Sequence, residues 1–162
     1  MLMKIFVLLL IFSWSSSYAD ILVGTGLSKV TQGRTVPALY LGIDKGSEVI
    51  QFSSLGVETE IYYHNSYRFS FYKQSAFGSV FGIKQRAGLG IGVLYARRAY
   101  REDKDTKEEV ETDFNIGPAF RFSMGITDYM FVSLESMYGI NNLLFLVLSF
   151  QNTSSINFGV RF

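Results

Sequence analysis

The 162-residue chain contains no cysteine and a single histidine, and it carries almost no excess of either charge. Without cysteine it has neither a disulfide framework nor a paired-cysteine metal site. Fifteen basic residues stand against fourteen acidic ones, so no bulk charge attracts nucleic acid. The chain also lacks a P-loop, a dinucleotide fingerprint and a basic helix; GLGIG at residues 88–92 is better interpreted as a close-packed strand face. We therefore expect no cofactor and no metal.

A long hydrophobic run is also missing from the N-terminus. Lys4 precedes a short apolar run at residues 5–12, and Ser17 and Ala19 are small residues at the two positions that a signal peptidase reads. A run this short cannot cross roughly 30 Å of hydrocarbon as a helix. The pattern predicts a secretory signal peptide over residues 1–19, cut before Asp20, rather than a membrane anchor. Residues 20–162 would then be one exported domain that is stable without disulfides.

Glycine and aromatic residues, by contrast, recur in nearly every segment. The chain has 15 Gly, 10 Tyr and 15 Phe, and 48% of its residues are hydrophobic. This mixture disfavours helix. Apolar side chains instead recur at every second position, which is typical of strands. Eight such runs can be counted, at residues 21–30, 36–44, 55–63, 77–84, 88–95, 114–123, 130–135 and 154–162.

The two faces of these runs have the opposite polarity to a water-soluble sandwich. In the clearest run, Leu89, Ile91 and Val93 alternate with Gly90 and Gly92. The side opposite the bulky residues is mainly glycine, alanine and serine with a few single charges, which is too small and too uncharged for a solvated face. Bulky rows facing lipid around a narrow packed lumen are the pattern of a transmembrane barrel. Eight strands leave an interior just wide enough to be filled by side chains.

We therefore predict an all-β fold, a transmembrane antiparallel up-and-down β-barrel. Eight strands are the simplest count, and ten remain an alternative because residues 48–54 and 142–150 are too apolar for ordinary loops. The first of these segments could extend the third strand, and the second could lengthen the last hairpin. An even count returns both termini to the periplasm. Short periplasmic turns are expected at residues 45–47, 85–87 and 125–128, and longer outer loops at 31–35, 64–75, 102–113 and 139–153.

The chain ends in INFGVRF, a strand that divides sharply into two faces. With the signal peptide and the glycine and aromatic strands, this ending resembles the small outer-membrane β-barrels of Gram-negative bacteria, the superfamily typified by the transmembrane domain of outer-membrane protein A. The resemblance implies an outer-membrane location and contact with the barrel-assembly machinery during biogenesis. It also implies an assembly signal formed by Ile156, Phe158, Val160 and Phe162. The resemblance is informative about architecture and almost silent about activity.

Charged residues on the expected inward faces predict a lumen that is plugged. Three acids and three bases would face inward: Glu58, Glu60, Arg121 and Glu135 near mid-barrel, and Lys84 and Arg161 nearer the base. Charges inside a low-dielectric barrel persist only when they are paired. An ion-pair network is therefore the main expectation, and a small-solute or ion channel is the alternative, because buried ionisable groups in membranes are often functional.

Other charged residues fall in the outer part of the barrel. Arg97, Arg98 and Arg101 lie next to tyrosines at the expected outer rim, where guanidinium groups can bind lipopolysaccharide phosphates or simply snorkel. Residues 101–113 hold seven acids and are interpreted as a solvated loop. Cation binding there would use Asp103, Asp105 and Glu108, but the spacing lacks the glycine and terminal glutamate of a calcium loop.

His64 and Ser66 raise the possibility of catalysis at the outer rim. Some small barrels resemble lipid A deacylases with histidine and serine separated by one residue, but HNSYRF departs from that pattern and no acid is spaced to orient the base. The expected role is therefore non-enzymatic: an integral outer-membrane barrel with a structural or surface-interaction role. Its partners would be outer-membrane lipid and lipopolysaccharide, with no nucleic acid. A lipid A hydrolase is the second alternative, and the sequence names no extracellular ligand.

Overall fold

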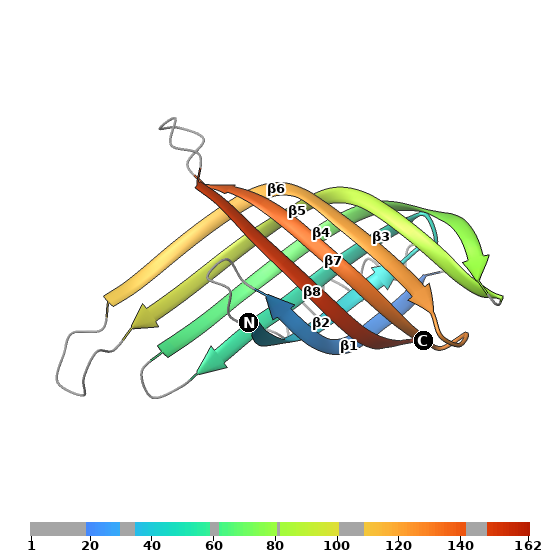
Figure 1. The fold of residues 1–162 in the computed structure, drawn as a ribbon, viewed down its shortest axis with the longest axis horizontal. Coiled ribbons are helices and arrows are strands. Elements are labelled where there is room, and N and C mark those ends of the chain that lie inside the picture. Colours follow the sequence, from blue (N-terminus) through green and yellow to red (C-terminus); the bar gives the residue numbers. More distant parts are fainter. Residues whose placement is uncertain (1–18, 30–34, 59–61, 81, 101–108, 142–148) are drawn as a thin grey trace.

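The computed structural model describes residues 19–29, 35–58, 62–80, 82–100, 109–141 and 149–162. These residues form eight antiparallel strands, each paired with its neighbours in sequence order, and the sheet closes into a barrel (Figure 1). The strands are β1 (Asp20–Lys29), β2 (Thr35–Asp44), β3 (Glu48–Glu58), β4 (Tyr62–Val80), β5 (Ile83–Tyr100), β6 (Glu109–Gly125), β7 (Met130–Asn141) and β8 (Ser149–Arg161). Within these ranges no helix is long and apolar enough to cross a membrane. The predicted fold class is confirmed with eight strands rather than ten.

One end of the barrel, which we call the base, holds both ends of the sheet. β1 begins there and β8 ends there, and Ile21 and Phe162 exchange two backbone hydrogen bonds of 3.0 Å. Closure continues upward from Leu22 opposite Arg161 to Lys29 opposite Ser154. The opposite end, the rim, is where the chain passes through residues 30–34, 59–61, 101–108 and 142–148, which lie outside the described ranges.

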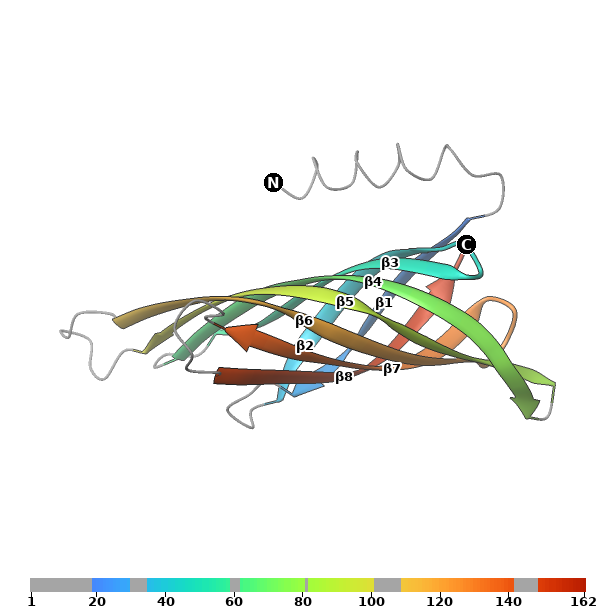
Figure 2. The same ribbon diagram turned by 90° about the horizontal axis from the view of Figure 1, so that it is seen from above.

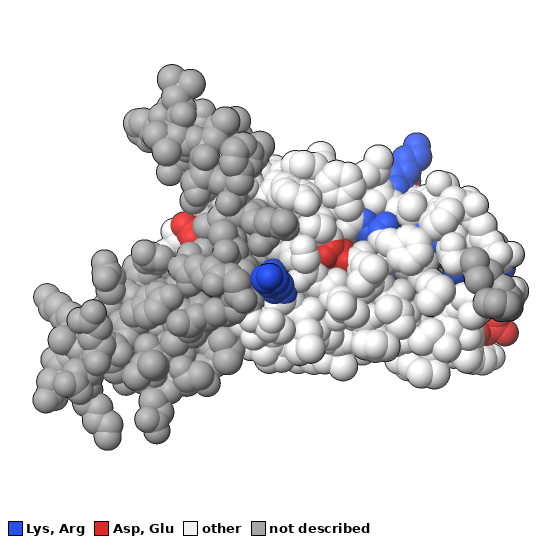
Figure 3. Space-filling view, viewed as in Figure 1, with Lys and Arg blue, Asp and Glu red and all other residues white. Residues whose placement is uncertain are grey.

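Side chains alternate between the two faces of the wall, with the bulky ones outside. Leu89 is 64% exposed and Phe162 is 75% exposed, whereas Gly88 on the inward row is buried. On the face seen in Figure 3, charged residues are few among the described ones. The structure thus confirms the predicted polarity for the runs of β1, β2, β5, β6, β7 and β8.

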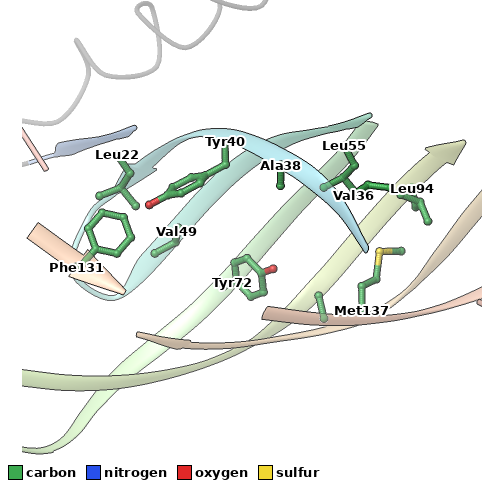
Figure 4. Packing of buried hydrophobic residues seen from close by; sticks show 11 residues of the cluster. Leu22, Val36, Ala38, Tyr40, Val49, Leu55, Tyr72, Leu94, Phe131 and Met137 are labelled. Carbon is green, nitrogen blue, oxygen red and sulfur yellow. The ribbon is translucent and has the colours of Figure 1, made fainter. Parts of the chain in front are cut away.

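The lumen contains two groups of apolar side chains, seen in Figure 4. Leu22, Tyr40 and Phe131 lie together toward the base, and Val36, Leu55 and Leu94 lie toward the rim, all of them buried. Tyr40 fits because glycine occupies two facing positions. Gly24 on β1 lies opposite Tyr40 on β2 and opposite Gly159 on β8. A Cβ at either glycine would overlap the Tyr40 side chain.

The first correction concerns two predicted strands that cross hairpin tips. Residues 55–63 contain the end of β3 and the start of β4, and residues 77–84 contain the end of β4 and the start of β5. Alternation continued across these tight connections, so each run resembled one strand. The predicted inward face of the first run was also wrong: Leu55 was expected to face lipid, but it is 0% exposed and faces the lumen. Residues 48–54, left open by the sequence, belong to β3.

The second correction concerns segments that were predicted to be loops or turns but belong to strands. Residues 64–75 are not an outer loop but the middle of β4, and residues 85–87 are not a turn but part of β5. β4 ends at Val80 and β5 begins at Ile83, and the turn residue Gly82 between them has a φ of 79° that favours glycine. The expected loops at 102–113 and 139–153 are shorter than predicted, because residues 109–113 begin β6 and β8 begins at Ser149. The base turns at 45–47 and around 126–129 agree with expectation.

The contact between Tyr40 and its glycines can be tested by Gly159→Ala. We expect the free energy of unfolding to fall by ~1–3 kcal/mol, because the new methyl group overpacks a filled interior. Urea titration of the refolded barrel, followed by circular dichroism, measures the change. Gly78→Ala is the matched control, since a Cβ there meets nothing within 4 Å. Equal effects of the two variants would show that the glycine row is not needed for packing.

Candidate functional site: the charged lumen

Glu135 is the centre of a buried polar cluster halfway along the lumen. Its carboxylate accepts hydrogen bonds from Arg68 Nη2 at 2.5 Å, Gln51 Nε2 at 2.7 Å and Ser133 Oγ at 3.0 Å. Arg121 Nε adds an ion pair of 3.6 Å to the second carboxylate oxygen. Glu135 and both arginines are almost fully buried. Both oxygens of the carboxylate are therefore shared among donors from strands β3, β4, β6 and β7.

Arg121 links this cluster to a second one at the base. Its Nη1 donates to Ser123 Oγ and to Gln74 Oε1, both at 3.0 Å. Gln74 Nε2 in turn donates to Asp44 Oδ1 at 2.9 Å. A continuous chain of polar contacts thus runs from Glu135 to Asp44.

Asp44 is the centre of the base cluster. Arg86 Nη1 donates to Asp44 Oδ2 at 2.8 Å, and Arg161 Nη2 lies 3.4 Å from the same oxygen. The backbone N–H of Gly46 caps the other oxygen at 2.8 Å. Arg161 also pairs through Nε with Asp20 Oδ2 at 3.4 Å. Asp44 is buried, while Arg86 and Arg161 are partly exposed, so the cluster sits where the lumen opens at the base.

An aromatic side chain separates the two clusters. The guanidinium carbons of Arg121 and Arg161 each lie 5.9 Å from the centre of the Phe131 ring. Tyr40 meets the same ring edge-on, with the ring centres 5.9 Å apart. A cation over an aromatic face is attracted to it. The Phe131 ring is therefore within reach of both guanidinium groups.

The structure brings together only some of the residues that were expected to face inward. Arg121 and Glu135 meet in the middle cluster, and Arg161 joins the base cluster. Lys84 is a correction: it is exposed at the base, two residues beyond Arg86, because β5 continues past the closed part of the barrel.

The two remaining acids in the predicted network are not placed in it. Glu58 is the last residue of β3. The Glu58 side chain, like Glu60 as a whole, lies outside the described part of the chain. The acids that pair inside the described lumen are Glu135 and Asp44.

Sequence reasoning missed several inward polar residues. Arg68 and Gln74 were assigned to an outer loop, Arg86 and Asp44 lay at or next to expected turns, and Gln51 lay in a segment left without assignment. The signal for Arg68 was present, because Ser66, Arg68 and Ser70 alternate with Tyr67 and Phe69. The density of polar residues hid this alternation.

The residues expected at the surface occupy varied positions. Arg97 is exposed on β5 near the rim, two residues from the exposed Tyr95, while the Arg98 side chain and Arg101 are not among the described parts. Ile156, Phe158, Val160 and Phe162 form one exposed outward row. Ser66 is 1% exposed and faces the lumen; nothing is described of the His64 side chain.

This arrangement of charges is suited to holding the barrel together. Within the described ranges no group of three or more histidine and acidic side chains is placed to hold a metal ion. In the middle cluster two guanidinium groups share one carboxylate, so Glu135 is the common counter-charge. A buried ion pair is strongly destabilised when one partner is removed.

We therefore expect Glu135→Gln to destabilise the barrel severely, by about 3–5 kcal/mol, because Arg68 and Arg121 both lose their counter-charge. Urea titration in detergent micelles measures the free energy of unfolding. Glu48→Gln is the control, since Glu48 is exposed at the start of β3. Adding Arg68→Gln to Glu135→Gln should recover part of the loss. A Glu135→Gln variant as stable as Glu48→Gln would show that the cluster contributes little.

Comparison with known proteins gives structural matches and no sequence matches. No protein-family model matches the chain, and no curated protein matches its sequence. Among solved structures, the chain is similar to the N-terminal β-barrel domain of Pseudomonas aeruginosa OprF, with a TM-score of 0.58, 9% identity, and coverage of 89% of this chain and 97% of the other. It is also similar to Neisserial surface protein A, with a TM-score of 0.52, 13% identity, and coverage of 88% and 95%.

At these identities the likeness concerns the fold alone. It agrees with the resemblance expected from the sequence: the neighbours are small outer-membrane barrels, and the described residues close into an eight-stranded barrel of the same kind. The chain thus shares the barrel fold of these neighbours.

Proposed function

We propose that this protein is an integral barrel of the bacterial outer membrane, exported and cleaved before Asp20, with a closed lumen and a structural or surface-interaction role. The observation that carries the proposal is the sidedness of the wall. Large apolar side chains are exposed on the outward row of one strand after another, including Leu39, Phe69, Leu89, Phe114 and Ile156. Such a surface is unfavourable in water and suits lipid.

The closed lumen supports a role that does not depend on transport. Tyr40 and Phe131 contact each other toward the base, and above them the Glu135 cluster fills the width of the barrel with side chains from four strands. A small-solute channel would require these contacts to open. The continuous polar chain from Glu135 to Asp44 is the feature that favours this second candidate, because it offers a route along which ion pairs could exchange.

The outer surface is the proposed site of interaction. Arg97 is exposed near the rim beside Tyr95, a pairing suited to lipopolysaccharide phosphates at the membrane boundary. The role requires no catalysis. The burial of Ser66 in the lumen supports this, because a lipid A hydrolase at the outer rim needs its nucleophile where lipid can reach it.

The final strand is proposed to have two roles. Ile156, Phe158, Val160 and Phe162 form an exposed apolar row that the barrel-assembly machinery could bind during insertion. The same strand then closes the sheet against β1. Closure is required because unpaired backbone groups cost several kcal/mol in lipid.

Spin labels can test the membrane location directly. Nitroxides at Leu89, Ile91 and Leu134 should show high accessibility to oxygen and low accessibility to a water-soluble nickel reagent, because these positions would face acyl chains. Ser79, exposed below the base, is the control and should show the reverse. High nickel accessibility at all four positions in reconstituted vesicles would overturn the membrane assignment.

Planar-bilayer recordings can distinguish the closed barrel from a channel. The refolded protein should give no stable unitary conductance, because aromatic and ion-pair contacts block the lumen. Arg121→Ala tests the block, and Arg97→Ala on the outer face is its control. Stable openings in the unmodified protein that grow with Arg121→Ala alone would establish the channel and contradict the structural role.

A further inference from the structure

The hairpin of β4 and β5 extends past the base of the barrel. β3 begins at Glu48, opposite Lys73, so the remainder of β4 down to Val80 lies beyond the end of its neighbour. On the other side, the pairing of β5 with β6 starts only at Gln85. Figures 1 and 2 both show this hairpin projecting farther than the other strands at that end.

One side of the projecting part is an open strand edge. The backbone N–H of Gln74 donates to Ser47 O at 2.7 Å, the last contact of β4 on that side. Backbone groups two residues apart point in the same direction along a strand. Ala76 therefore points its N–H and C=O past the end of β3, where no described residue pairs with them. The other side of β4 remains paired with β5 as far as Val80 opposite Ile83.

This edge lacks two of the usual protections and carries a third, a bulge. Natural edge strands are often guarded by charged residues or proline, whereas residues 74–83 contain neither. The described residues from Ser75 to Ser79 are all exposed. A register shift between Ala76 and Gly78 bends the strand, and the Phe77 ring packs against Phe122 with the ring centres 5.7 Å apart. The hairpin is thus anchored to the wall by Phe77, and its tip projects beyond it.

The surroundings of the edge are cationic. Residues 61–101, which include the whole hairpin, contain no acid. Lys73 lies where the edge starts and Lys84 lies near its tip. Lys84, Arg86 and Arg161 also line a pocket of about 440 Å³ between the hairpin and the turn after β6, in which Asp128 is the acid. Carboxylates approaching the tip of the hairpin would therefore meet exposed positive charge, whereas the exposed Glu48 lies opposite Lys73 where the edge starts.

We propose that the projecting edge of β4 binds an extended segment of a periplasmic protein by strand addition, and that an acidic residue flanking the segment pairs with Lys84. Main-chain hydrogen bonds supply the affinity in this mode of recognition, and side chains supply specificity. The choice of an acidic partner follows from the positive charge at the tip of the hairpin. The periplasmic location of the partner rests on the proposed function, whereas the open strand edge and its neighbouring charges do not depend on it.

The proposal can be tested with the barrel in lipid nanodiscs, where both ends are open to solvent. The probe is a fluorescent synthetic peptide in which valine and threonine alternate between a pair of glutamates at each end. Anisotropy should show saturable binding, and the amide of Ala76 should exchange its hydrogen more slowly when peptide is present. A version with lysines in place of the glutamates should bind weaker by about tenfold.

Two controls separate strand addition from simple charge attraction. The same peptide with alternate amides methylated should not bind, because it cannot form the ladder, and this control leaves the protein unmodified. Lys84→Gln should weaken binding of the glutamate peptide, whereas Lys29→Gln, at the opposite end of the barrel, should not. Ala76→Pro should abolish binding while the barrel still shifts mobility on heating.

Three results would overturn the proposal. Equal binding of the methylated peptide would show that charge alone holds it, and no binding of the unmodified peptide would show that the edge is closed. Disulfide-linked dimers of Ser79→Cys in the membrane would show a second copy of the chain as the occupant. None of these results bears on the membrane location, which the spin labels at Leu89 and Ile91 decide independently.

Discussion

Pairing of β1 with β8 closes the sheet and gives the backbone N–H and C=O groups of these two strands hydrogen-bond partners. In lipid an unpaired N–H or C=O group has no water to bind, so a spanning sheet must have no free edge. The register from Leu22 opposite Arg161 to Lys29 opposite Ser154, with the paired contacts of Ile21 and Phe162, meets this requirement down to the base. The one long departure, the end of β4, lies outside the closed part of the barrel, where water can solvate it.

The closed wall also determines what the interior must contain. Bulky side chains face outward, so the lumen is filled by glycine, small polar residues and a few large groups that compensate for them. Tyr40 packs into the space left by Gly24 and Gly159. Glu135 and Asp44 each neutralise arginines from distant parts of the chain. Ion pairs and aromatic contacts in a barrel of this width therefore serve to pack the lumen.

The sequence predicted the architecture well because its signal is local and repeated. Alternation between Leu89 and Gly90, or between Phe120 and Arg121, directly reflects the two faces of one wall. Hairpin tips were harder to predict, since the alternation in the sequence continues from the end of β4 at Val80 into the start of β5 at Ile83. Polar composition misled the interpretation of β4, where Arg68 and Gln74 resembled loop residues.

The sequence spacing of the charged residues could not predict which of them form ion pairs with one another. Arg121 and Glu135 were both expected inside, and they lie opposite each other on β6 and β7. The second arginine on Glu135, Arg68, comes from β4, across the lumen rather than along the wall. Which side chains meet there depends on how far the strands are staggered around the barrel. That stagger is a property of the closed sheet as a whole.

The strands differ in length, and this difference is not spread evenly around the barrel. β1, β2 and β3 have 10, 10 and 11 residues, whereas β4, β5 and β6 have 19, 18 and 17. Ten residues are about what a tilted strand needs to cross a bilayer, so the longer strands project beyond it on one flank only, and the last residues of β4 do so past the base. A molecule bound to these projecting strands would fix the rotational orientation of the barrel in the plane of the membrane. Arrays built through such contacts would be directional rather than isotropic.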